Sequence, residues 1–369
     1  MNQVPLRRIY GCLLWIVFAN LAFSQTTWTG SSNDLVWNTS GNWSSGLPSL
    51  SLSATIGLNS SPTITVSTAG EVQGIQKGGT GSLTITGSSL TLGGGHIGTF
   101  NSILVNTGSL TINSALINTQ NKRITLNTTG TALTLNGNLD TGGVTTQIGN
   151  LNTGGTLTFN GNRSGGNSLI LRDGLINTTG ILANLGGGNA RLISSGTVVS
   201  SRTGGPAIEG GSAGLVLESS GTFKLGANNQ IAGLLDLSGG TLDLDTFSNS
   251  ATSGMAIQRL EMNVASAVST LKFDSVVGSS LSFAEVASTW ATNASLVVTG
   301  FGAGDSLRFG TNASSLTLAQ LNQITINGVS AQIDQSGFVT PIPEASTFGI
   351  LMGAGCLFGA LYRRRCHQR

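Results

Sequence analysis

A short alternation of apolar and polar residues that returns along the chain limits what this sequence can fold into more than any other feature. Each copy opens with a small residue and then alternates apolar and polar side chains. Six copies occupy residues 81–86, 108–113, 131–136, 155–160, 221–226 and 240–245. Alternation at a period of two predicts a strand with one buried face, and the glycine and asparagine residues at the boundaries predict turns.

The spacing of these copies indicates how the strands assemble. Their leading leucines stand at positions 83, 110, 133 and 157, which gives steps of 27, 23 and 24 between successive copies. A repeat of this length, with short strands between turns, is what one coil of a β-solenoid requires. We therefore predict an all-β chain wound into a right-handed parallel β-helix, or β-solenoid, with a cap at each end. Because the spacing drifts, a β-sandwich or an array of β-sandwiches is the alternative.

Stacked coils of this kind bury an inner column of Leu, Ile, Val and Phe and place Thr, Ser and Asn outside or in turn ladders. Two Asn-Gly-Asn triplets, at residues 136–138 and 160–162, are expected to form turns because Asn and Gly tolerate positive φ. The sequence thus predicts a long polar outer surface over an apolar interior.

The beginning of the chain has the pattern of a secretory signal peptide. Arg7 and Arg8 precede an apolar run over residues 9–23, and Ala22 and Ser24 occupy the small-residue positions of a cleavage site. We predict that residues 1–24 are removed, with processing after Ser24.

The stretch 341–369 is a second processing segment. It carries Pro343 and Glu344, an uncharged run from position 345 to position 362, and then Arg363, Arg364 and Arg365. A run of that length is near the lower limit for a membrane-spanning helix, which needs roughly 17–25 residues. The arginines are expected to stay on the cytoplasmic side, which leaves the rest of the chain outside.

This tail resembles the PEP-CTERM sorting signal of Gram-negative exosortase systems, which combines a short Pro-Glu-Pro-like motif, a membrane helix and an arginine cluster. Ala345 stands where the usual motif has its second proline. The resemblance implies recognition and cleavage near Pro343 and Glu344 by an exosortase-type membrane enzyme, followed by release or surface attachment. It also implies an exported protein that is anchored transiently in the inner membrane before it reaches the cell surface or the extracellular space.

Setting both processing segments aside changes the composition. All three cysteines, at positions 12, 356 and 366, lie in these segments, so disulfides cannot stabilise the remainder. Six of the 17 Lys and Arg residues and one of the 15 Asp and Glu residues also lie there. The remainder therefore has 11 basic and 14 acidic residues and a net charge of −3. A chain with this charge has no excess of basic residues that would attract nucleic acid.

Residues 25–60 are rich in tryptophan, with Trp28, Trp37 and Trp43 close together in sequence. This opening resembles that of bacterial proteins with autotransporter-associated β-strand repeats. We expect an N-terminal cap in which the three indoles cover the open apolar end of the first coil. The alternative is an aromatic platform that contacts the sugar rings of a glycan.

The repeat region is expected to cover residues 61–269, and residues 270–340 to form a β-rich C-terminal cap. In this cap, residues 280–284, 294–299, 305–310 and 323–327 have the pattern of strands, and residues 316–322 that of one helical turn. The segment resembles the terminal module of PEP-CTERM proteins with autotransporter-like repeats. It is expected to close the solenoid and lead into the sorting tail.

Motifs with a known chemistry are weak in this chain. Residues 93–98 match G-x-G-x-x-G, but strand-like alternation follows where a dinucleotide site needs a helix. His96 is the one histidine between the two processing segments, and no nucleophile elbow accompanies it. We therefore predict no catalytic residue, cofactor or metal site.

Asp243 and Asp245 are two residues apart on one predicted strand, so their side chains point to the same face of that strand. We interpret them as the polar face of a strand whose Leu242 and Leu244 point inward. The alternatives are a calcium site completed by Asp236 and a pair of carboxylates for glycan cleavage.

The sequence thus leads to a function without catalysis. We expect an exported structural protein of the surface or extracellular matrix, sorted by an exosortase. By resemblance, such proteins accompany exopolysaccharide and biofilm formation. The expected partners are the exosortase, exopolysaccharide and, transiently, the inner membrane, with no nucleic acid. A carbohydrate-binding adhesin that uses the tryptophan-rich opening and a polysaccharide lyase or glycosidase on a β-helix are the alternatives.

Overall fold

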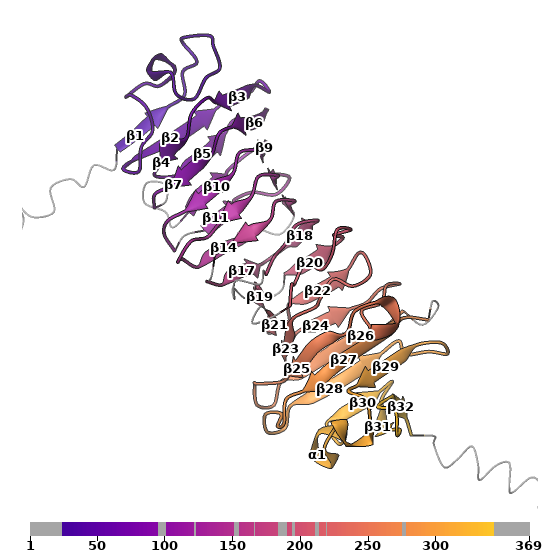
Figure 1. The fold of residues 1–369 in the computed structure, drawn as a ribbon. Coiled ribbons are helices and arrows are strands. Elements are labelled where there is room, and N and C mark those ends of the chain that lie inside the picture. Colours follow the sequence, from indigo (N-terminus) through magenta and orange to yellow (C-terminus); the bar gives the residue numbers. More distant parts are fainter. Residues whose placement is uncertain are drawn as a thin grey trace, which may run out of the picture. The chain divides into compact units, whose positions relative to one another are not determined.

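The computed structural model describes residues 24–94, 101–121, 123–150, 155–165, 167–183, 190–193, 196–210, 214–218, 220–274 and 278–342. The fold within these ranges is a β-solenoid with almost no helix, as the alternating sequence predicts (Figure 1). The chain divides into two compact units, residues 1–161 and 162–369.

Three parallel sheets make up the first unit, and each coil contributes one strand to a sheet. The first sheet contains, in order, β1 (Ser24–Thr27), β2 (Leu52–Gly57), β5 (Ile75–Gly78), β8 (Asn101–Val105), β11 (Arg123–Leu126) and β14 (Thr146–Asn150). The second contains β3 (Thr63–Val66), β6 (Ser82–Gly87), β9 (Ser109–Ile112), β12 (Ala132–Leu135) and β15 (Thr156–Phe159). The third contains β4 (Gly70–Val72), β7 (Leu90–Leu92), β10 (Leu116–Asn118) and β13 (Leu139–Asp140).

The second unit begins with the short strand β16 (Arg163–Ser164) and builds two long rows of strands. One row contains β17 (Leu169–Arg172), β19 (Ala190–Ile193), β21 (Gly214–Glu218), β23 (Leu234–Ser238), β25 (Ile257–Glu261), β27 (Ser280–Val286) and β29 (Ser306–Phe309). The other contains β18 (Leu175–Thr178), β20 (Thr197–Ser200), β22 (Thr222–Leu225), β24 (Thr241–Asp243), β26 (Val268–Lys272), β28 (Ser295–Thr299), β30 (Ile324–Ile326), β31 (Val329–Ile333) and β32 (Val339–Pro341).

Helical structure is confined to short turns in the described ranges. The predicted helical turn is α1 (Leu318–Leu321), which begins after a capping box between Thr317 and Gln320. Three 3₁₀ turns are η1 (Ser40–Asn42), η2 (Ala251–Ser253) and η3 (Ala313–Ser315).

Strand register confirms the predicted repeat. Leu83 pairs with Leu110, Leu110 with Leu133, and Leu133 with Leu157, so each step of the sequence repeat corresponds to one coil. These four side chains are at most 1% exposed and form one apolar column inside the first unit. Because equivalent residues stack in register, each coil buries the apolar face of its neighbours, as the periodicity requires.

The parallel register also decides between the two predicted architectures. A β-sandwich is built from antiparallel sheets. Within the described ranges, antiparallel pairing between strands occurs where β31 meets β30 and β32. The alternative of a β-sandwich array is therefore wrong for these residues.

Coils of the second unit continue beyond residue 270, where the sequence pattern suggested that a separate cap begins. Leu242 pairs with Leu271, Leu271 with Val298, and Val298 with Ile326, all in parallel register. The four expected strands of this region are present as β27, β28, β29 and β30. The structure that closes the stack is smaller than expected and consists of α1 and the hairpin β31–β32.

Glycines of the Asn-Gly-Asn turns are required for a different reason than the sequence suggested. Gly137 and Gly161 do not have positive φ. A Cβ atom on Gly137 would lie closer than 3.0 Å to the carbonyl oxygen of Ser114, and one on Gly161 would meet the carbonyl of Gly137 in the same way. These glycines therefore allow successive coils to approach closely, which is a constraint of packing and not of backbone conformation.

Candidate functional site

Several residues of the predicted processing segments lie outside the described ranges, and the predictions made on them stay predictions. They are Ala22 of the signal-peptide cleavage site, Pro343, Glu344 and Ala345 of the sorting motif, and Arg363, Arg364 and Arg365 of the basic cluster. His96 also lies outside. In the part of the chain that the structure describes, no helix combines the length and the apolar character needed to cross a membrane.

The tryptophan cluster of the first unit is buried. Trp28, Trp37 and Trp43 are 5%, 1% and 4% exposed, and the ring of Trp43 makes edge-to-face contacts with the other two at centroid distances of 5.0 and 4.9 Å. The Trp43 indole N–H donates to the carbonyl of Trp37 at 2.7 Å, and the Trp37 amide donates to Thr65 of β3 at 2.8 Å. The three indoles thus pack against one another, and the predicted cap on the first coil stays a prediction. A sugar-stacking platform needs an open ring face, which these rings do not present.

Asp34 organises the loop that carries these tryptophans. Its Oδ1 accepts from the Val36 amide at 3.0 Å and from the buried Asn42 amide group at 2.5 Å, and its Oδ2 accepts from the Thr39 hydroxyl at 2.7 Å. The Thr39 hydroxyl, followed by the Val36 amide and Asn42, lowers the pKa of Asp34. Sequence reasoning missed this group because its members are common turn residues with no distinctive spacing.

Asp243 and Asp245 serve as ion-pair partners. Asp243 binds Lys272 at 2.8 Å and Asp245 binds Lys224 at 3.2 Å. Register explains the first pair, because Asp243 and Lys272 stand opposite each other on β24 and β26. Asp245 lies beyond the end of β24 with a φ of +52°, so the prediction that it shares a strand with Asp243 is wrong. The Asp243 carboxylate raises the pKa of Lys272 through its hydrogen bond and its charge. Leu242 and Leu244 are fully buried, as predicted.

Asp236 lies on β23, in the other row of strands, and does not join these two carboxylates. It accepts from the Ser238 hydroxyl at 2.8 Å and from the Asn263 amide at 3.0 Å. Glu261, its register neighbour, pairs with Arg259 at 2.5 Å. Among the residues with a described position, no group of three Asp, Glu, His or Cys side chains is placed to hold a metal ion.

Two cations are buried near turns. Lys77 is fully buried and donates to the carbonyls of Gly78, Gly79 and Thr107 at 2.7, 2.8 and 3.3 Å, and burial lowers its pKa. In the second unit, Arg163 is 2% exposed and donates to the carbonyl of Leu182 at 3.1 Å. Burial lowers the pKa of Arg163 to about 10. Both cations bind backbone carbonyls, which for Lys77 come from its own coil and the next one, and they thus have a structural role.

Rows of identical polar side chains follow the coils of the first unit. The amide of Asn160 donates to Asn136 at 2.9 Å, and that of Asn136 donates to Asn113 at 2.8 Å. Ser109 donates to Ser82 at 2.7 Å in a second row. Neighbouring strands are about 4.8 Å apart, so each row presents the same group at that interval along its sheet.

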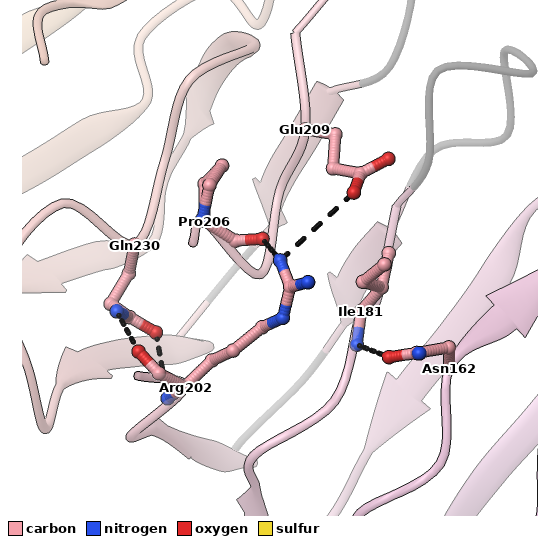
Figure 2. A network of polar contacts seen from close by, with 6 residues as sticks. All are labelled: Asn162, Ile181, Arg202, Pro206, Glu209 and Gln230. Carbon is pink, nitrogen blue, oxygen red and sulfur yellow. Dashed lines mark hydrogen bonds and ion pairs between the residues drawn. The ribbon is translucent and has the colours of Figure 1, made fainter. Parts of the chain in front are cut away.

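Polar contacts of the second unit connect coils through one buried amide (Figure 2). Gln230 accepts from the backbone amide of Arg202 at 3.1 Å and donates to the carbonyl of the same residue at 2.9 Å. Arg202 donates in turn to the carbonyl of Pro206 and lies 4.0 Å from the Glu209 carboxylate. Gln230 thus replaces a pair of backbone hydrogen bonds, which makes this network part of the scaffold.

A small cavity near the C-terminal end of the second unit was not foreseen from the sequence. Its volume is about 190 Å³, and its lining comes from η2, β27, β29 and the segment before β32. Its side chains lie far apart in sequence and come together through the coil stacking and the final hairpin, so no local motif could identify them.

Comparison with known proteins finds no match, either to a family model, to a curated protein or to a solved structure. The resemblance of the tail to PEP-CTERM signals and that of the body to autotransporter-like repeats therefore stay predictions.

Proposed function

We propose that this chain is a non-enzymatic structural protein of the cell surface or extracellular matrix. In this proposal residues 1–24 direct its export, and an exosortase-type enzyme acts on the tail near Pro343 and Glu344. The repeat region winds as a right-handed solenoid, the hand that parallel strand connections favour. The fold is compatible with a structural surface protein or an adhesin.

The observation that carries the proposal is the in-register repetition of outward polar side chains. The row formed by Asn113, Asn136 and Asn160 repeats one hydrogen-bonding group from coil to coil. A repeated weak contact gains strength by multivalency, since each further contact on the same partner forms at a high effective concentration. Such a surface suits association with a repetitive partner, such as exopolysaccharide or another matrix chain.

The use of the acidic residues supports a role without catalysis. The carboxylates that the sequence offered for glycan cleavage, Asp243 and Asp245, each pair with a lysine of an adjacent coil. Glycoside hydrolysis by a carboxylate pair needs one acid and one base that both face the substrate. We therefore rank a lyase or glycosidase below a structural role.

An assay for released reducing ends tests this ranking. The purified chain is incubated with the exopolysaccharide of the producing strain, beside the variants Asp243→Asn and Asp245→Asn. The proposal expects release at the background level for all three proteins. Release above background that disappears in either variant would establish the enzyme instead.

A further inference from the structure

The cavity at the C-terminal end of the second unit forms where the final hairpin folds back onto β29. Arg308 of β29 and Phe338, just before β32, form an antiparallel bridge. Gly337 makes this close approach possible, because its φ is +84° and a Cβ atom there would lie 2.6 Å from the carbonyl oxygen of Phe309. Asp334 fixes the hairpin turn by accepting from the amides of Ser336 and Phe338 at 2.8 and 2.9 Å.

Arg308 is held in one orientation at the wall of this cavity. Its Nε donates to the carbonyl of Ser336 at 3.0 Å, and its guanidinium lies over the Phe338 ring at 5.4 Å from the centroid. It has no ion-pair partner among the residues that the structure describes. With Nε occupied, the two terminal nitrogens are left to bind an anion. A planar guanidinium in a fixed orientation matches the two oxygens of a carboxylate.

The rest of the lining combines apolar surface with several hydroxyl groups. The ring of Phe338, which is 37% exposed, supplies apolar surface, whereas Leu281 lines the cavity but is fully buried. Hydroxyls come from Thr252, Ser282 and Ser306, and no carboxylate lines the cavity. The Ser282 oxygen accepts from the Ala251 amide at 2.8 Å, which leaves its proton available as a donor.

Size restricts the ligand further. Sites for drug-sized molecules usually enclose roughly 300–1,000 Å³. A cavity of about 190 Å³ holds a single ring. A ligand that matches all these features has a carboxylate, one apolar ring face and several hydroxyl groups.

We infer that this cavity binds a uronic acid residue of an acidic polysaccharide, with its carboxylate on Arg308. The apolar face of the sugar ring contacts Phe338, and the sugar hydroxyls bond with Thr252 and Ser282. A sugar hydroxyl also donates to Ser306, whose own proton goes to Ser280 at 2.9 Å. The inference rests on the proposed extracellular role, where such polysaccharides are encountered, and it adds one specific contact to the weak contacts of the polar rows.

Titration calorimetry on the full chain tests the inference. The probe is tri-galacturonate, and its methyl ester is the matched neutral probe, because the ester keeps the ring and its hydroxyls but removes the charge. We expect the free acid to bind at least about tenfold more tightly than the ester, since a charge-assisted hydrogen-bonded pair is lost. Acetate as a competitor reports whether the carboxylate alone is recognised.

Three variants assign the binding to this cavity. Arg308→Ala is expected to abolish the preference for the acid, and Arg308→Lys to weaken binding because lysine lacks the planar pair of donors. Arg123→Ala is the control, because it removes the same charge from a strand of the first unit where the arginine donates to Gln147. Circular dichroism on each variant verifies folding.

Equal binding of the acid and the ester, or binding that survives Arg308→Ala in a folded protein, would overturn the inference. Displacement of tri-galacturonate by acetate at equal concentration would also overturn it, because the sugar ring would then contribute nothing. Export and C-terminal processing of Arg308→Ala are measured in parallel. Loss of binding with normal processing concerns the cavity alone, whereas failed processing in the wild type concerns the proposed function.

Discussion

Alanine at position 137 is the substitution that tests the coil stacking most sharply. A Cβ atom on Gly137 would lie within 3.0 Å of the carbonyl oxygen of Ser114 in the preceding coil and 2.8 Å from the amide nitrogen of Ala115. Relief of this overlap requires the two coils to separate by about 1 Å, which the dense interior resists. We expect Gly137→Ala to destabilise the first unit by about 1–3 kcal/mol, the usual cost of overpacking.

The matched control is Gly143→Ala. Nothing lies within 4 Å of a Cβ atom built at that position, and its φ is not positive. The control should change stability by no more than about 0.5 kcal/mol. Urea unfolding followed by circular dichroism measures both variants, and hydrogen exchange on β9, β12 and β15 reports whether the loss is local. Equal stability of the two variants would refute the close-approach explanation, and tolerance of Gly137→Asn would favour a turn glycine with positive φ.

Three further substitutions test other parts of the structure. Leu133→Ala removes a fully buried side chain between Leu110 and Leu157 and should lower the free energy of unfolding by about 2–5 kcal/mol. The control Thr134→Ala changes an outward side chain and should lower it by less than about 1 kcal/mol in the same urea unfolding. The folded state lowers the pKa of Asp34, so this carboxylate stabilises the loop that carries the tryptophans at pH values above the ordinary carboxyl pKa. That stabilisation is lost as the pH falls through the lowered pKa. Asp34→Ala should therefore shift tryptophan emission to longer wavelength at neutral pH, and an unchanged spectrum would contradict the role given to Asp34. Burial lowers the pKa of Lys77, so the unfolded chain keeps this proton to a higher pH than the folded chain, and stability should rise as the pH approaches 10.5. Lys77→Met should remove that part of the rise, measured as the difference between the two pH–stability curves.

The coils could be predicted from the sequence period because parallel stacking places one residue of each repeat at the equivalent position of each coil. Leu83, Leu110, Leu133 and Leu157 could thus be aligned from their spacing alone. Within the second unit, a column of paired residues occupies positions 242, 271, 298 and 326, and these steps of 29, 27 and 28 residues exceed most of the steps in the first unit. The glycine that opens many of the repeats is also absent after position 270. The sequence repeat therefore stops being recognisable although the coils continue.

Residues that depend on distances between coils could not be predicted in the same way. Gly137 was recognised as a turn residue, but its clash with Ser114 exists only once the coils are stacked. Arg308 and Phe338 meet because a hairpin returns to β29, and the sequence between them gives no sign of that contact. The burial of Lys77 likewise follows from carbonyls of two turns, one of them supplied by Thr107.

Mass spectrometry of both chain ends shows whether the protein is exported and then processed by an exosortase. The protein is recovered from the extracellular fraction of cells with and without an exosortase. We expect a first residue at Gln25 in both strains, and a C-terminus near Pro343 and Glu344 only where the exosortase is present. Equal persistence of the peptide through Arg369 in both strains would show that no exosortase processes this chain.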